Sequence, residues 1–345
     1  MSNTGNTGNT GNTGNTGNTG NAGINGDVGG GWILPDRADF PFAMESYPIP
    51  HYPPGRLSDL RRRVYIHETT PTGQGRITVE FRSEPLAAGT EVNFHDRNWA
   101  GRWYAWRVLR QFTAARWGTK TWNTRALNND LAQMLLDLHV AVHGGQSVQE
   151  EEYETLYAMA RDERASALGE ILTQDVEFVT AFMEALAMTP GSHYRTFRIL
   201  HIASLIGSFA ALHYKHVFNR PRPSWEMPAL MPPVPVPGHS AFPSGHATQA
   251  HLMAKCMGLV FDAAALPMGH KGALKETLNA LARRVARNRE IAGLHYPSDS
   301  SAGEKLATHV LGRLVELKDA EEDGVNSGYR TFEVAVADAL QEWTL

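Results

Sequence analysis

The chain has 345 residues, an apolar share of 42% and a formal net charge of -4 at pH 7. This length accommodates one large domain or two modest ones, and the charge gives no sign of a nucleic-acid-binding surface. The single cysteine, Cys256, excludes an intramolecular disulfide and a cysteine-based zinc cage.

Residues 1–30 form a tail in which Asn-Thr-Gly repeats up to about Gly20. The tail has almost nothing apolar to bury, so we expect it to be disordered. It also lacks the basic start and apolar core of a secretory signal, and we therefore expect a cytoplasmic protein.

Residues 31–120 are expected to form an irregular region that wraps the main domain. Pro48, Pro50, Pro53 and Pro54 make long helices improbable there. The runs 76–81 and 90–94 alternate enough to predict short strands, which together would form one hairpin.

Residues 121–345 show the periodicity of helices and predict a mainly α protein, a helical bundle. Leucines 127, 131, 135 and 138 recur at spacings of three and four residues, which places them on one helix face. Ser147 and Glu150 have the spacing of a capping box. The predicted helices span 126–143, 148–164, 166–188, 192–218, 244–265, 274–291, 302–317 and 329–343.

The run 199–212 is the most apolar stretch, but it is shorter than the ~20 residues that a membrane span needs, and it contains His201. We therefore expect a buried core helix and no transmembrane segment. The apolar helix faces are also compatible with a homo-oligomer, because periodicity does not separate an internal core from a dimer surface.

The first cluster of chemical interest is Lys215 with Arg222 and Pro223, at the end of a predicted helix. Lysine supplies a compact positive charge, and arginine offers a planar fork that binds two oxygens at once. Alone, this cluster is equally compatible with a basic helix end that complements the helix dipole.

The second cluster is Pro243-Ser244-Gly245-His246, at the start of another predicted helix. The unpaired N–H groups of a helix start bind oxyanions, Gly245 lets the backbone approach a ligand, and Ser244 adds a hydroxyl donor. His246 is suited to proton transfer. Alone, the pattern equally fits an ordinary serine cap with a bystander histidine.

The third cluster contains Arg289, His295 and Asp299, with Pro297 ending the helical pattern between the last two. An aspartate within reach of an imidazole fixes its tautomer, which makes the other ring nitrogen a nucleophile or a ligand. A lone histidine near a lone aspartate is more often structural.

Taken together, the order and spacing of the three clusters resemble the signature of the type 2 phosphatidic acid phosphatase and vanadium haloperoxidase superfamily. The resemblance runs from Lys215 to Asp299 and implies a helical bundle of the acid phosphatase type. Asn288 departs from the serine that the superfamily often has before the arginine. The resemblance does not support any interpretation of residues 1 to about 120.

The resemblance implies a metal-independent phosphatase that acts on a soluble small-molecule phosphate ester. His295 would form a phosphohistidine, Asp299 would orient it, and His246 would protonate the leaving group. The anion would be held by Lys215, Arg222, Ser244, Gly245 and Arg289. This arrangement suits phosphoryl transfer, which depends on positioning and charge stabilisation.

The resemblance also leaves open a vanadium-dependent haloperoxidase that uses vanadate as cofactor and peroxide and halide as substrates. His295 would then bind vanadium. His239, seven residues before His246, resembles a second histidine of the bromoperoxidases and would lie at a halide or substrate site; it equally fits a plain loop histidine. Leu212 departs from the tryptophan or arginine expected in haloperoxidases. The residues favour the phosphatase narrowly.

Overall fold

The computed structural model describes residues 60–69, 76–85, 101–114, 123–140, 142–143, 146–316 and 331–343. They belong to two compact units, one within Asp36–Trp99 and the other including Ala100–Leu345. In the first unit, strand β1 (Leu60–Thr69) pairs antiparallel with β2 (Arg76–Pro85). The predicted strand 76–81 is therefore part of β2, but its partner is β1. The predicted strand 90–94 and the predicted tail 1–30 lie outside the described residues.

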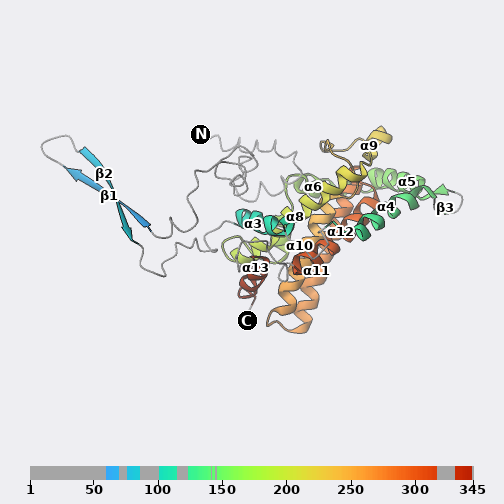
Figure 1. The fold of residues 1–345 in the computed structure, drawn as a ribbon. Helices are drawn as coiled ribbons and strands as arrows, with labels where there is room; N and C mark the ends of the chain where they lie inside the picture. Colours follow the sequence, from blue (N-terminus) through green and yellow to red (C-terminus); the bar gives the residue numbers. More distant parts are fainter. Residues whose placement is uncertain are drawn as a thin grey trace. The chain divides into compact units, whose positions relative to one another are not determined.

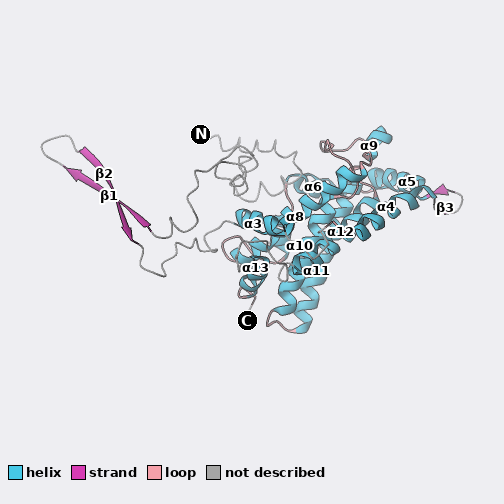
Figure 2. Ribbon diagram, in the orientation of Figure 1, coloured by secondary structure: helices cyan, strands magenta, loops and turns pink. Residues whose placement is uncertain are grey.

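The second unit is a bundle of helices, as the sequence predicts (Figures 1 and 2). Two short strands, β3 (Val142–His143) and β4 (Gln146–Ser147), pair between its second and third helices. The elements are α3 (Gly101–Ala114), α4 (Arg125–Val140), α5 (Val148–Asp162), α6 (Arg164–Val176), α7 (Val179–Ala185), α8 (Tyr194–Phe218), α9 (Pro223–Glu226), the 3-10 turn η4 (Pro228–Leu230), α10 (Gly245–Ala263), α11 (Met268–Ile291), α12 (Pro297–Glu316) and α13 (Thr331–Leu340). Helix α3 belongs to this unit and packs on α8, so the helical unit starts before the predicted boundary at residue 121.

Helix α10 lies at the centre of the bundle, where it contacts α8, α11, α12 and α13. Both α8 and α10 are buried over most of their circumference, which explains why their apolar residues show little sidedness in the sequence. The two helices cross closely at Gly207, where an added Cβ would lie 3.1 Å from the Cα of Gln249. The Gln249 side chain donates a hydrogen bond to Ser204 Oγ at 2.9 Å. This crossing sets the distance between two of the elements that carry the predicted clusters.

The N-terminus of α8 is capped by a residue from the other end of the chain. Glu342, just after α13, accepts hydrogen bonds from the backbone N–H groups of Arg195 (2.9 Å) and Thr196 (2.8 Å). It also accepts one from the Thr196 hydroxyl at 2.8 Å. A carboxylate at a helix start satisfies orphan donors and complements the positive end of the dipole. The C-terminal segment therefore holds the start of α8.

The expectation of no transmembrane segment is wrong. Residues Tyr194–Glu226 contain an 18-residue window with a mean hydropathy of 1.2, so this stretch is long and apolar enough to cross a membrane. Helix α8 alone has 25 residues, about 37 Å at 1.5 Å per residue, against a hydrocarbon core of about 30 Å. The expectation judged only the apolar run 199–212, although the predicted helix 192–218 already extended beyond it on both sides. Within the described structure, 78% of the window is buried.

The single helix predicted for 166–188 is divided into α6 and α7. Glu177 adopts an extended conformation (φ -164°, ψ 153°) between them, and its carboxylate accepts a hydrogen bond from Thr180 N at 3.1 Å. The helical periodicity continues across this break, so the sequence pattern did not reveal it. The break leaves the last carbonyl groups of α6 without partners inside the helix. One of them, the carbonyl of Gln174, accepts a hydrogen bond from the His246 side chain of α10.

We predict opposite effects of alanine at two glycines of α12. An added Cβ at Gly303 would lie 2.9 Å from both Ala247 Cβ and Ser244 O, whereas at Gly312 it would meet nothing within 4 Å. Gly303→Ala should lower the free energy of unfolding by about 1–3 kcal/mol through overpacking. Gly312→Ala should raise it by about 0.5–1 kcal/mol. Denaturant unfolding of both variants measures this, and equal changes would contradict the close α10–α12 contact.

Candidate active site

Lys215 lies in the last turn of α8, and its ammonium group is buried. The helix ends at Asn219, whose left-handed conformation (φ 45°) turns the chain into the loop that follows. The Lys215 Nζ atom donates to the carbonyl oxygens of Ser240 and Ala241, both at 2.8 Å. These bonds join the first predicted cluster to the loop before the second. Burial, followed by the charge of Arg222, lowers the pKa of Lys215 well below its usual value.

Arg222, in the loop after α8, uses each nitrogen of its guanidinium as a donor. Nε donates to His239 O (3.0 Å) and NH1 to Leu294 O (2.9 Å). NH1 also lies 3.0 Å from His295 Nε2, and NH2 lies 3.0 Å from His239 Nδ1. Arginine has no acceptor, so His295 Nε2 accepts and carries no proton. His239 Nδ1 lies near both Arg222 NH2 (3.0 Å) and the carbonyl oxygen of Ser240 (3.3 Å). Burial, and then the charges of Lys215 and Arg222, lower the pKa of His239 to about 4.

The geometry fixes the tautomer of His295. Because Nε2 accepts from Arg222, the ring proton of the neutral imidazole resides on Nδ1, which lies 3.2 Å from Asp299 Oδ2. Asp299 Oδ2 also accepts from Tyr296 N at 3.0 Å. Burial and then the charge of Arg222 lower the pKa of His295 well below its usual value, so the lone pair on Nε2 is present at neutral pH.

Pro297 starts a helix here, whereas the sequence pattern predicted only the end of one. Helix α12 begins at Pro297 and not at the predicted residue 302, because the fixed φ of proline suits the first position of a helix. Asp299 is then the third helical residue, where a carboxylate accepts from the backbone N–H of the residue just before the helix, Tyr296. A local helix-start motif thus positions Asp299 beside His295.

Helix α10 begins at Gly245, after Ser244 as its capping residue. Ser244 is fully buried, and its hydroxyl oxygen accepts from Ala247 N at 3.4 Å. Its backbone N–H donates to Asp299 O at 2.9 Å, which ties the start of α10 to α12. Gly245 lines the pocket, whereas Ser244 and Asp299 lie behind the lining. Ser244 therefore contributes to the site through the cap and its bond to α12.

His246, one residue into α10, is also fixed in one tautomer. Its Nε2 lies 3.1 Å from the carbonyl oxygen of Gln174 in the last turn of α6. A carbonyl only accepts, so Nε2 carries the proton and Nδ1 has the free lone pair. The ring packs against Phe178, with centroids 5.0 Å apart. Burial, followed by the charge of Arg289, lowers the pKa of His246 well below its usual value.

Arg289, near the end of α11, has two nitrogens without a partner. NH2 donates to Asp175 Oδ1 at 2.8 Å, but Nε and NH1 are buried and have no hydrogen-bond partner. The residue is 1% exposed and lines the same pocket as Lys215 and Arg222. A buried donor without an acceptor costs about 1–3 kcal/mol, and more when it is charged. The two nitrogens therefore require an acceptor that the described residues do not supply.

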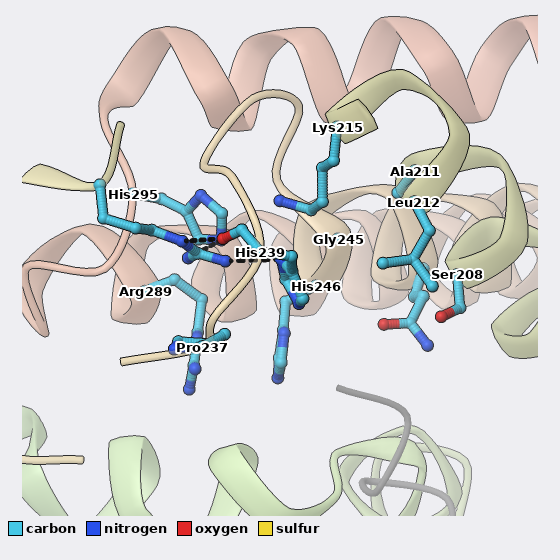
Figure 3. Close-up of a pocket in the computed structure, with 12 residues that line it drawn as sticks. Ser208, Ala211, Leu212, Lys215, Pro237, His239, Gly245, His246, Arg289 and His295 are labelled. Atoms are coloured by element: carbon cyan, nitrogen blue, oxygen red, sulfur yellow. Dashed lines mark hydrogen bonds between the residues drawn. The ribbon is translucent and has the colours of Figure 1, made fainter. Parts of the chain in front are cut away.

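These side chains surround one pocket of about 30 Å³. In Figure 3, Lys215 and His295 point toward one another, while Ser208, Ala211 and Leu212 of α8 lie on the side away from His295. The pocket is small and lined by cations, so it suits a small anion. The lining residues are Ser208, Ala211, Leu212, Lys215, Arg222, Pro237, His239, Gly245, His246, Gln249, Arg289 and His295.

The sequence patterns missed several residues that hold these side chains. Gln174 and Asp175 come from α6, where they looked like ordinary polar positions at a helix end. Glu152 and Arg220 form a buried ion pair at 2.9 Å. Arg220 stands in the Arg-Pro-Arg-Pro run, but the run alone does not distinguish it from its neighbours. Glu152 was concealed in a run of three glutamates that looks like the solvated face of a helix.

Comparison with known proteins points to one family. A model described as the PAP2 superfamily matches residues 197–320, which include all three clusters. No curated protein matches the chain. A solved structure that matches is titled as the first transmembrane PAP2 type phosphatidylglycerolphosphate phosphatase from Bacillus subtilis, with 14% identity and a TM-score of 0.28. The match covers 62% of this chain and 92% of that protein. The expected cytoplasmic location has no support from these matches.

We predict that Arg289→Lys weakens anion binding by about 10- to 100-fold. Lysine keeps the charge but cannot reproduce the donors at Nε and NH1, and a charged hydrogen bond contributes about 1.5–3 kcal/mol. Titration calorimetry with inorganic phosphate measures the effect. Arg287→Lys is the matched control, because Arg287 lies on the same helix but pairs with Glu163 at the surface. Equal affinities for the two variants would show that Arg289 does not bind the anion.

Proposed function

We propose that the protein is a metal-independent phosphoric monoester hydrolase with a phosphohistidine intermediate, and the premise is the match of residues 197–320 to the PAP2 superfamily. The family match supports a phosphatase-like hydrolase. The finer proposal rests mainly on the orphaned buried nitrogens of Arg289 beside two other buried cations. Among the described residues, no carboxylate pairs directly with Lys215 or Arg222, although burying an unpaired charge is costly. A phosphoryl group supplies the missing negative charge and acceptors.

In the proposed first step, His295 Nε2 attacks phosphorus and the bond to the ester oxygen breaks. The phosphoryl oxygens accept hydrogen bonds from Arg222, which frees the Nε2 lone pair that Arg222 contacts in this structure. Asp299 stabilises the positive charge that develops on the ring. Lys215, Arg289 and the N-terminus of α10 stabilise the phosphoryl charge.

His246 acts as the acid and then the base. The positive charges of Arg289, Arg222 and Lys215 contribute to the low pKa of its imidazole. A bound dianion offsets these charges, so the pKa rises and Nδ1 takes up a proton. That proton passes to the leaving alkoxide. The neutral ring next removes a proton from water, which attacks phosphorus, breaks the bond to His295 Nε2 and releases phosphate.

The haloperoxidase alternative has no support from the family match. His239 lines the pocket, but its Nδ1 lies 3.0 Å from Arg222 NH2. Its position is thus accounted for by holding Arg222, and no observation in the described residues favours a halide site. Vanadate is nevertheless a useful inhibitor for testing the phosphatase proposal, because it is a tetrahedral oxyanion that also adopts the five-coordinate geometry of phosphoryl transfer.

We predict that the purified protein hydrolyses p-nitrophenyl phosphate with no added metal and in the presence of a chelator, and that orthovanadate inhibits it. His295→Asn should reduce kcat by at least on the order of 10⁴-fold, because it removes the nucleophile. His270→Asn, at an exposed position on α11, is the control. Full activity in His295→Asn would exclude the phosphohistidine, and bromide oxidation without ester hydrolysis would favour the peroxidase.

We also predict that anion binding takes up a proton at His246. The free imidazole is neutral at pH 7 because its pKa is lowered, and the bound anion raises that pKa, so affinity should increase as pH falls toward 6. Sulfate is the suitable probe, because it does not titrate in this range. Calorimetry in buffers of different ionisation enthalpy measures the uptake. His246→Gln should bind sulfate with less proton uptake, and unchanged uptake in this variant would assign the proton to another group.

A further inference from the structure

Arg220 lies two residues before Arg222 but does not line the pocket. Its guanidinium is 9% exposed and is surrounded by partners from two other parts of the chain. NH1 donates to Asp299 Oδ1 at 2.8 Å and to Ser298 Oγ at 2.7 Å. NH2 donates to Glu152 Oε2 at 2.9 Å. Arg220 therefore joins the loop after α8 to both α5 and α12.

An aromatic ring fixes the plane of the same guanidinium. The Arg220 Cζ atom lies 3.7 Å from the centroid of the Tyr296 ring. The Tyr296 hydroxyl in turn donates to Glu226 Oε2 at 2.5 Å. An arginine that is both stacked and bound at two nitrogens has lost most of its rotational freedom. Its contact with Asp299 is consequently made at one defined angle.

The contact between Arg220 and Asp299 determines which carboxylate oxygen of Asp299 faces His295. Arg220 occupies Oδ1, and this leaves Oδ2 for His295 Nδ1 and Tyr296 N. Without Arg220, the carboxylate would be free to rotate about its Cβ–Cγ bond, and Oδ1 would be buried without a partner. The proton on His295 Nδ1 would then have a less well-placed acceptor, and once a bound anion takes up the Arg222 donors the ring would be able to turn or change tautomer.

Glu152 is the second residue that holds Arg220 and the start of α12 together. Its Oε1 accepts from Ser298 N at 2.6 Å, in the first turn of α12, while its Oε2 accepts from Arg220. The residue is 6% exposed, so this carboxylate is buried with its charge paired. Glu152 thereby fixes the start of α12, which carries Asp299, relative to the guanidinium that holds Asp299.

We propose that Arg220 and Glu152 are positioning residues for the reaction. They hold the Asp299 carboxylate in one rotation, and through it they hold His295 in the tautomer with Nε2 free to attack. This inference rests on the proposed hydrolysis through His295. Neither residue touches the substrate, so their loss should affect the chemical step and leave the affinity of the pocket for anions nearly unchanged.

The kinetic test compares kcat and KM for hydrolysis of p-nitrophenyl phosphate. Arg220→Gln should lower kcat by about 10- to 100-fold, as loss of an orienting partner does elsewhere, with little change in KM. Arg220→Lys should recover part of kcat, because it restores the charge but not the fork. Arg283→Gln, which removes an exposed ion pair with Glu276, should behave as the parent protein. An Arg220→Gln variant that raises KM and leaves kcat unchanged would overturn the inference.

A spectroscopic test does not depend on turnover. In ¹⁵N-histidine NMR spectra at pH 7 with saturating sulfate, which takes up the Arg222 donors, His295 of the parent protein should show a protonated Nδ1 and a bare Nε2. Arg220→Gln should show a mixture of tautomers. An inactive parent protein with this signal would refute the proposed hydrolysis alone. An active parent protein whose His295 signal is unchanged in Arg220→Gln would refute the positioning role alone.

Folding is controlled separately, because Arg220→Gln leaves two buried carboxylates without their cation. The double variant Arg220→Gln/Glu152→Gln removes one charge of each sign and carries the same test if the single variant does not fold. Thermal unfolding identifies the folded variants. A folded double variant with the parent kcat and a single His295 tautomer would also overturn the inference.

Discussion

The site depends on the burial of Lys215, Arg222 and Arg289 around one small pocket. Positive charges that converge away from water repel one another and lose their hydration, so such an arrangement is costly until an anion enters. The bundle withstands this cost because backbone carbonyls, not carboxylates, fix two of the three cations. Carbonyls orient a cation and leave most of its charge for a ligand. A carboxylate at the same place would have neutralised the site.

Acidic side chains are placed just outside the cationic lining. Asp175 pairs with Arg289 and Asp299 with His295, and neither carboxylate is among the residues that line the pocket. Each acid stabilises the position of a residue that does line the pocket, without entering the pocket itself. The result is a gradient of charge, positive at the pocket and negative behind it. An incoming phosphate would encounter donors, while the imidazoles keep partners that define their tautomers.

The sequence was sufficient for the helical class, for most helix positions and for choosing the lysine, arginine and histidine residues that line the pocket. Helices such as α8 and α10 have strong apolar patterns, and the three clusters have spacings that motifs can capture. The sequence was insufficient where the determining contact joins distant segments. The helix break at Glu177 leaves the carbonyl oxygen of Gln174 available to His246, a contact that the sequence of α6 does not indicate. The importance of Arg220 became clear only from its contacts with Glu152 and Asp299.

The role of Ser244 shows another limit of prediction from sequence. A serine before Gly245 reads equally well as an anion ligand and as a helix cap, since the same hydroxyl serves both purposes. The structure displays the cap, with Ala247 N as donor, and the backbone bond to Asp299 O. Pro297 illustrates the converse case. Its effect on the chain depends on which side of it the helix forms, and the local sequence allows both.

Helix α8 connects the site to the last residues of the chain. Its first turn is held by Glu342, and its last turn carries Lys215, about 30 Å further along a rigid rod. A truncation before Glu342, or a fusion partner that pulls this residue away, would release the far end of that rod. Shortening the C-terminus for expression would therefore disturb the lysine of the pocket from the opposite side of the bundle.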